Sequence, residues 1–322
     1  MTFGSLWNAN PEWAGIFSEV DYLMVDALER YCERVLLSRS SALMGLLLAK
    51  SLRFNHAALP LRSEELARLC SEQLWRVRDE SGEFVEAPNA PSVSDLLTGV
   101  EELIDCGAEL VDVRPLTQPV LPIGPPLLVS DGPDGHLYLA YRRYAMAEEV
   151  VTRALLKSAR EQHLLEGVTV DLIVSSLTHT TMSVEGKQAI RHAIERTVSV
   201  ITGGPGRGKT TVIASLLIGL RIAAEKGERS YSVALCAPTA KAAVRMEEAI
   251  KAQLAKFGET WGDLQRHVTI DERSGSVHRL LGIRPDNTRS LRQLDHDLVI
   301  IDEVSMLDIA LLAKIIEHAP NT

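Results

Sequence analysis

The run of residues 197–211, TVSVITGGPGRGKTT, constrains the fold of this chain more than any other segment. It begins with β-branched residues, which favour a strand, and then breaks into the pattern G-x-x-x-x-G-K-[ST]. Glycines allow a tight turn that points backbone N–H groups at phosphate oxygens, and a following helix adds the positive end of its dipole. The segment therefore predicts a strand, a helix and, between them, a phosphate-binding loop made of Gly203, Gly204, Pro205, Gly206, Arg207, Gly208, Lys209, Thr210 and Thr211.

A second motif downstream supplies negative charge. Residues 298–303, LVIIDE, form an apolar run that ends in two carboxylates, and we expect it to be a strand. Lys209 would contact the β and γ phosphates, and the hydroxyl of Thr210 would be a ligand for Mg²⁺, with a metal partner in the acidic pair. A surface turn or a solvated acidic pair would account for either motif alone. Because both occur in order after β-branched runs, the sequence predicts binding of a nucleotide with Mg²⁺.

Composition excludes several classes of protein. With 322 residues and 46% hydrophobic residues, the chain is long enough for about two globular domains. The longest apolar run near the amino end is 42–49, ALMGLLLA, which is far short of the ~20 residues that cross a bilayer. We therefore expect a cytoplasmic protein with no membrane partner. The four cysteines show no C-x-x-C spacing, which favours structural thiols over a metal site.

The net charge of −9 is unevenly distributed. Residues 1–120 carry 19 acidic and 10 basic side chains, whereas the rest of the chain is balanced. Because a phosphate backbone is bound by clustered lysine and arginine, the acidic part is a poor candidate for binding nucleic acid. A well-solvated surface and a surface that docks a protein both remain open for it.

The order of patterns predicts three regions. Residues 1–115 carry apolar positions at helical spacing and are expected to form a small all-helical domain. Residues 116–180 follow with a proline-rich linker, a β-hairpin around residues 132–135 and a connecting helix. In residues 181–322 strands and helices alternate, which is typical of an α/β fold with a parallel sheet.

Four segments narrow the class of nucleotide-binding protein, because they occur together and in order. They are EGKQAIRHAIE with Gln188, CAPTAKAA at 236–243, SVHRLLG at 276–282, and LVIIDEVSMLD. Together they closely resemble the RecD-type helicases of superfamily 1, the alpha subunits of exodeoxyribonuclease V. The resemblance implies a P-loop NTPase with a RecA-like first motor domain.

In function, the resemblance implies a 5′ to 3′ ATP-dependent motor that acts on single-stranded and double-stranded DNA in recombinational repair. It also implies two partners, the helicase-nuclease (beta) and scaffold (gamma) subunits, contacted through the amino-terminal domain.

The resemblance also assigns roles to individual residues. Gln188 matches the glutamine that reads adenine, Asp302 the carboxylate that holds Mg²⁺, and Glu303 the residue that polarises the attacking water. Thr239, Lys241 and His278 match positions that contact the DNA strand. A purely structural role is also open for each of these three: Thr239 as a helix cap, Lys241 as a solvated side chain, and His278 as an internal packing residue. Arg207 and Ala240 depart from the family pattern, which commonly has a small hydroxyl residue and a glycine there.

The end of the sequence also departs from the family. Family members continue with a strand carrying a Gly-Asp-x-x-Gln sensor and a second motor domain with an arginine finger, and neither pattern follows Glu303 here. We therefore expect a partial RecA-like domain with a gap or rearrangement in its sheet, and an isolated chain that is not an active motor. A non-catalytic subunit that binds ATP or a partner remains an alternative. Gln188 and CAPTAKAA argue against an unrelated kinase or ATPase.

Overall fold

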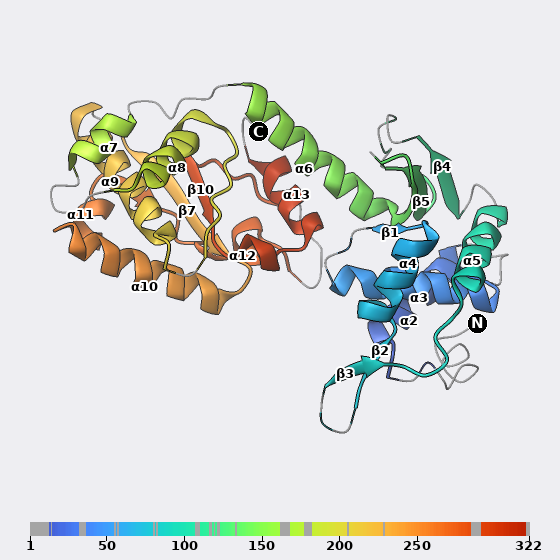
Figure 1. Ribbon diagram of the computed structural model, residues 1–322. Coiled ribbons are helices and arrows are strands. Elements are labelled where there is room, and N and C mark those ends of the chain that lie inside the picture. The colour runs from blue at the N-terminus through green and yellow to red at the C-terminus, as the bar shows by residue number, and fades with distance from the viewer. Residues whose placement is uncertain are drawn as a thin grey trace. The chain divides into compact units, whose positions relative to one another are not determined.

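The protein forms two compact units, residues Met1–Glu149 and Val150–Thr322, and each is considered by itself (Figure 1). The computed structural model describes the chain apart from residues 1–12, 14, 32–36, 55, 57, 80, 82, 107–109, 116–117, 119, 121–122, 133, 162–167, 177–181, 205, 228, 285–290 and 320–322. The division lies within one helix, α6, and differs from the boundaries expected near residues 115 and 180. Within the described residues, no helix is long and apolar enough to span a membrane.

Four helices form the apolar centre of the first unit. They are α2 (Glu19–Tyr31), α3 (Arg39–Arg53), α4 (Ser63–Leu69) and α5 (Val93–Asp105). Ser38 and Ser92 cap α3 and α5 by accepting hydrogen bonds from backbone N–H groups of the first turn. A Cβ at Gly99 would lie 2.5 Å from the carbonyl oxygen of Ser40, so the missing side chain lets α5 approach α3 closely.

The first unit also contains strands, so the expectation that residues 1–115 are all-helical is wrong. A four-stranded sheet has the order β1-β6-β5-β4, and a separate two-stranded sheet pairs β2 with β3. The strands of these sheets are β1 (Ala58–Pro60), β2 (Arg76–Arg78), β3 (Phe84–Glu86), β4 (Val111–Arg114), β5 (Leu127–Asp131) and β6 (Leu137–Tyr141). The strands before residue 115 are only three or four residues long, too short to show a clear alternation.

The predicted hairpin is confirmed. Strands β5 and β6 pair antiparallel from Leu127–Tyr141 to Asp131–Leu137, and Gly135 N donates to Gly132 O (2.9 Å) in the turn. Strand β4 joins β5 in parallel across the proline-rich segment. Helix α6 (Arg142–Arg160) follows β6 directly and confirms the expected connecting helix.

The second unit has a parallel sheet with the order β10-β7-β8, which confirms the predicted α/β class. A short strand, β9, pairs with the carboxyl end of β7. The strands are β7 (Tyr231–Ala237), β8 (Val268–Ile270), β9 (Gly275–Ser276) and β10 (Leu298–Ile301). The helical segments of this unit are α7 (Val170–Ser176), α8 (Val184–Glu195), α9 (Lys209–Gly227), α10 (Ala240–Lys256), α11 (Trp261–Gln265), α12 (Val277–Leu281), η3 (Val304–Met306) and α13 (Ile309–His318).

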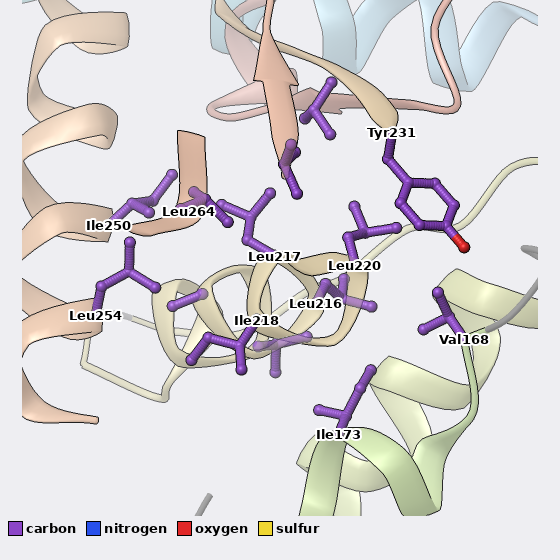
Figure 2. Close-up of a cluster of buried hydrophobic side chains, with 14 of the residues drawn as sticks. Val168, Ile173, Leu216, Leu217, Ile218, Leu220, Tyr231, Ile250, Leu254 and Leu264 are labelled. Atoms are coloured by element: carbon purple, nitrogen blue, oxygen red, sulfur yellow. The ribbon is translucent and has the colours of Figure 1, made fainter. Parts of the chain in front are cut away.

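Helix α9 is the centre of the larger apolar cluster. Leu217 and Leu220 are fully buried, and Figure 2 shows side chains of α10 on one side of α9 and Val168 and Ile173 on the other. A Cβ at Gly219 would lie 2.4 Å from Ile173 Cγ1, so this glycine lets α7 pack directly on α9. Because α9 is apolar around most of its circumference, it is fixed on several sides.

The strand predicted at residues 197–202 is not formed, although Ile201 packs against the same cluster. Val200 is 70% exposed, whereas a strand in the middle of a parallel sheet would be buried on both faces. The backbone of Val198 is hydrogen-bonded to a side chain, that of Ser158, instead of to a neighbouring strand. A β-branched sequence was therefore not sufficient to form a strand there.

A buried ionic cluster connects the end of β8 to the segment that precedes β10. His296 Nε2 lies 2.7 Å from Asp271 Oδ2, and both side chains are almost fully buried. Arg273 donates side-chain and backbone hydrogen bonds to Asp271, and these bonds hold the pKa of the Asp271 carboxyl well below its usual range. The charged form of Asp271 therefore stabilises this part of the sheet.

The free energy of unfolding of the second unit is expected to fall as the pH is lowered below about 4, where Asp271 is protonated in the unfolded chain. The stabilisation that the charged Asp271 contributes is complete above that pH, because the pKa of its carboxyl is depressed in the folded state. Asp271→Asn should lower the free energy of unfolding at pH 7 by about 2 kcal/mol and flatten the acid limb of the curve, measured by urea denaturation. Glu247→Gln, which breaks an exposed pair with Lys251, should change it by less than about 0.5 kcal/mol.

Candidate functional site

The glycine-rich segment forms a loop that leads directly into α9. Gly206 and Gly208 have φ angles of +71° and +86°, a region that side chains with a Cβ rarely adopt. Val212 N donates to Gly208 O (3.0 Å), so the helix begins as soon as the loop ends. The first backbone N–H groups of α9 have no partner within the helix and are available to an anion. Pro205, also predicted to line the loop, lies outside the described residues.

Two basic side chains lie against the loop. Lys209 Nζ donates to the carbonyl oxygens of Gly203 and of Gly204, the latter at 3.2 Å. A Cβ at Gly203 would lie 3.5 Å from Arg207 Cβ, so the Arg207 side chain starts beside the glycines, and the residue is exposed. Arg207 thus adds a positive charge to the loop at a position where the family commonly has a hydroxyl residue. Thr210 and Thr211 are half-buried in the first turn of α9.

The direction of α9 places the loop near the carboxyl ends of the strands. Helix α9 ends at Gly227, β7 begins at Tyr231, and the two elements pack against each other. A helix of 19 residues is about 28 Å long and a strand of seven about 23 Å, so a helix running back along β7 starts near the other end of that strand. The loop therefore lies toward the edge where β7 and β10 end.

The acidic pair lies at this edge. Strand β10 pairs in parallel with β7, and Asp302 N extends the ladder by donating to Cys236 O (2.9 Å). Asp302 Oδ1 accepts from Glu303 N (2.9 Å), which fixes the carboxylate of Asp302. Glu303 is exposed and has a φ of +53°, a left-handed conformation that costs a non-glycine residue about 1 kcal/mol or more. This conformation turns the chain sharply and leaves the Glu303 side chain in solvent.

The residues that the sequence associates with DNA lie at the same end of β7. Thr239 accepts from Ala242 N (3.1 Å) and so caps α10, while Lys241 is exposed in the first turn. Strand β9 pairs with Cys236 and Ala237 and leads into α12, where His278 is exposed. The alternative of internal packing for His278 is therefore wrong, and the capping role of Thr239 is confirmed.

Gln188 lies on the exposed side of α8, opposite the buried Ile190 and Ile194. No hydrogen bond within the described residues joins its side chain to the phosphate loop. The sequence alone gave no signal for two residues that hold the segment before the loop, Ser158 and Arg196, because they meet across 38 positions in the chain.

The hydroxyl and carboxylate oxygens predicted as metal ligands suit a cation that also binds phosphate oxygens. Among the described residues, no group of three or more histidine, cysteine or carboxylate side chains could hold a metal ion. Mg²⁺ binds one or two protein oxygens and completes its octahedral shell with phosphate and water oxygens. The hydroxyl of Thr210 and the carboxylate of Asp302 fit that requirement, since the ion would arrive with the nucleotide.

Comparison with known proteins shows which family the chain resembles. A family model described as an AAA domain matches residues 186–322. The RecBCD enzyme subunit RecD of Mycobacterium tuberculosis is 37% identical over 201 residues, which is 59% of this chain and 33% of that protein. The chain is thus similar to RecD-type helicases, and the match to an AAA domain implies a nucleotide-binding domain.

Two further relatives match over shorter lengths. The RecBCD enzyme subunit RecD of Haemophilus influenzae is 38% identical over 135 residues, covering 40% of this chain and 21% of its own length. The ATP-dependent RecD2 DNA helicase of Deinococcus radiodurans is 36% identical over 126 residues, covering 38% and 14%. The chain thus spans about a third or less of the relatives it matches.

Gly206→Ala should lower the free energy of unfolding by about 1 to 2 kcal/mol, because alanine is strained at a positive φ. The site has open space, so no clash contributes. Gly227→Ala is the matched control: it also has open space but ends α9 without a positive φ, and the change should be neutral or stabilising. Urea denaturation measures both, and equal effects would contradict the left-handed turn at Gly206.

Proposed function

We propose that the second unit binds ATP with Mg²⁺ and belongs to the motor of a 5′ to 3′ DNA helicase subunit of a RecBCD-type complex. The observation that carries this proposal is the carboxyl end of β7. There the pairing of β10 and β9 with β7 brings the acidic pair to the same edge of the sheet as the starts of α10 and α12, and α9 directs the glycine loop toward that edge. Such an edge is where open α/β sheets bind ligands.

In this function, Lys209 leaves the carbonyl oxygens of Gly203 and Gly204 and binds the β and γ phosphates. Both carbonyls lie on the loop itself, so the side chain already reaches across the space that phosphates would occupy. Thr210 and Asp302 would hold Mg²⁺, which would supply charge neutralisation on the phosphates. Glu303 is exposed beside Asp302 and polarises the attacking water, and Gln188 reads the adenine edge.

The face formed by Thr239, Lys241 and His278 contacts a DNA strand. Thr239 keeps its cap of α10 and also reaches a phosphate, since a hydroxyl can donate one hydrogen bond while it accepts another. Lys241 and His278 add donors on the neighbouring elements α10 and α12. ATP hydrolysis and DNA contact would then share the end of one strand, β7.

The first unit docks onto the helicase-nuclease and scaffold subunits. Two observations favour this role: the acidic surplus of residues 1–120 is unsuited to a phosphate backbone, and two of the relatives are named as subunits of the RecBCD enzyme. Work on chromosomal DNA would place the complex in the cytoplasm.

Lys209→Ala should weaken binding of Mg²⁺-ATP by roughly 10- to 100-fold, the value of a charged hydrogen-bonded contact. Isothermal titration calorimetry on the folded chain measures this affinity. Lys226→Ala, in the last turn of the same helix, is the control and should leave it unchanged. Wild-type affinity in the Lys209 variant, or no Mg²⁺-dependent uptake by the unchanged chain, would refute the nucleotide site. Binding without any hydrolysis would favour a non-catalytic ATP-binding subunit.

Lys241→Ala should weaken binding of single-stranded DNA at every sequence and reduce the slope of log affinity against log salt by about 0.7, the value for one lost phosphate contact. Lys251→Ala is the matched control on α10, because Lys251 pairs with Glu247 and lies over Trp261. Fluorescence anisotropy at several salt concentrations measures both slopes. A change of equal size in the control would show that Lys241 contributes only general charge.

A further inference from the structure

The segment that enters the phosphate loop is held by a buried serine. Ser158 Oγ donates to Val198 O and accepts from Val198 N, both at 2.9 Å. The Ser158 residue is only 3% exposed, so water does not compete effectively for these bonds. The Ser158 hydroxyl therefore satisfies both the backbone N–H and the carbonyl oxygen of Val198, which a neighbouring strand would pair if Val198 lay in a sheet.

A guanidinium group reinforces the same junction. Arg196 Nη1 lies 3.1 Å from the carbonyl oxygens of Ser158, Ala159 and Glu161. The last carbonyls of a helix have no intrahelical partner and carry the negative end of its dipole, so a cation is favoured there. Arg196 thus connects the end of α6 to the start of the segment that enters the loop.

The phosphate loop follows within a few residues. Ser199 Oγ donates to His192 O (2.7 Å), and Gly203 begins the loop four positions later. Only a short, partly exposed stretch separates Val198 from the glycines, and it belongs to no strand. Because this stretch is short, the position of Val198 limits where the chain can enter the loop.

We propose that Ser158 and Arg196 are positioning residues for the phosphate loop, and we call Ser158, Arg196 and Val198 the α6 clasp. When the clasp is closed, the loop is held in its binding geometry. When the clasp opens, the apparent affinity for nucleotide falls in proportion to the fraction of molecules whose loop remains competent to bind. By linkage, bound nucleotide stabilises the closed clasp to the same extent. The inference rests on the proposed binding of Mg²⁺-ATP at this loop.

The test combines affinity with hydrogen exchange. A fluorescent ATP analogue with Mg²⁺ should bind Ser158→Ala and Arg196→Ala about 3- to 10-fold more weakly than the unchanged chain, well below the unfolding temperature. Arg196→Lys, which keeps a donor and the charge, should recover part of the loss. In the unchanged chain, Mg²⁺-ATP should slow exchange of the Val198 amide, and Ser158→Ala should remove that protection.

Two controls separate positioning from general stability. Ser51 is also buried and donates to a backbone carbonyl, that of Leu48, in the first unit, so Ser51→Ala should reduce stability without changing nucleotide affinity. Arg191→Ala removes an exposed charge from α8 and should change neither.

Each outcome decides the proposal. If the unchanged chain binds the analogue and Lys209→Ala does not, while both clasp variants bind like the unchanged chain, the α6 clasp is refuted and the nucleotide site stands. No binding by the unchanged chain would overturn both. Should an alanine variant fail to fold, exchange at Val198 in the unchanged chain decides, since no slowing by Mg²⁺-ATP would refute the coupling.

Discussion

Parallel pairing along the buried strand β7 is the constraint on which the second unit depends. Its residues are almost fully buried, and its carboxyl end is paired with β9 on one side and β10 on the other. Because parallel strands end at one edge, this pairing brings segments that are far apart in sequence to one place. The acidic pair, the cap of α10 and the start of α12 owe their proximity to this one strand.

The phosphate loop is held differently from the acidic pair at the end of β10. Asp302 continues a backbone ladder, and its position follows from the register of β10 against β7. The loop is fixed at its end by the apolar surroundings of α9 and at its beginning by Ser158 and Arg196. Side-chain contacts are easier to lose than a sheet ladder, since each depends on one residue. The phosphate loop should therefore move more readily than the acidic pair.

Similarity to known proteins and structure support different parts of the functional account. The chain is similar to RecD-type helicases, and the matched family model covers the part of the chain that carries the loop and the acidic pair. The structure adds which side chains are exposed, which of them cap a helix and which are hydrogen-bonded. Lys209 across the loop carbonyls and Glu303 in a left-handed conformation are features that similarity alone does not give.

Much of the proposed site could be predicted from the sequence, because glycines at fixed positions before Lys209 and carboxylates after an apolar strand have local physical meaning. The α/β class followed likewise from alternating patterns. Residues 197–202 show where this reasoning fails. Their β-branched sequence favours a strand, but a strand also requires a partner strand, and the backbone of Val198 is hydrogen-bonded to the Ser158 side chain instead. Strand β1 was missed for the same reason, since its partner β6 lies far along the chain. Strands β2 and β3 pair with each other locally but are too short to show a clear alternation. Local sequence fixed the chemistry of the loop and the acidic pair, while only tertiary contacts between distant residues decided which backbone groups are paired and what holds the loop.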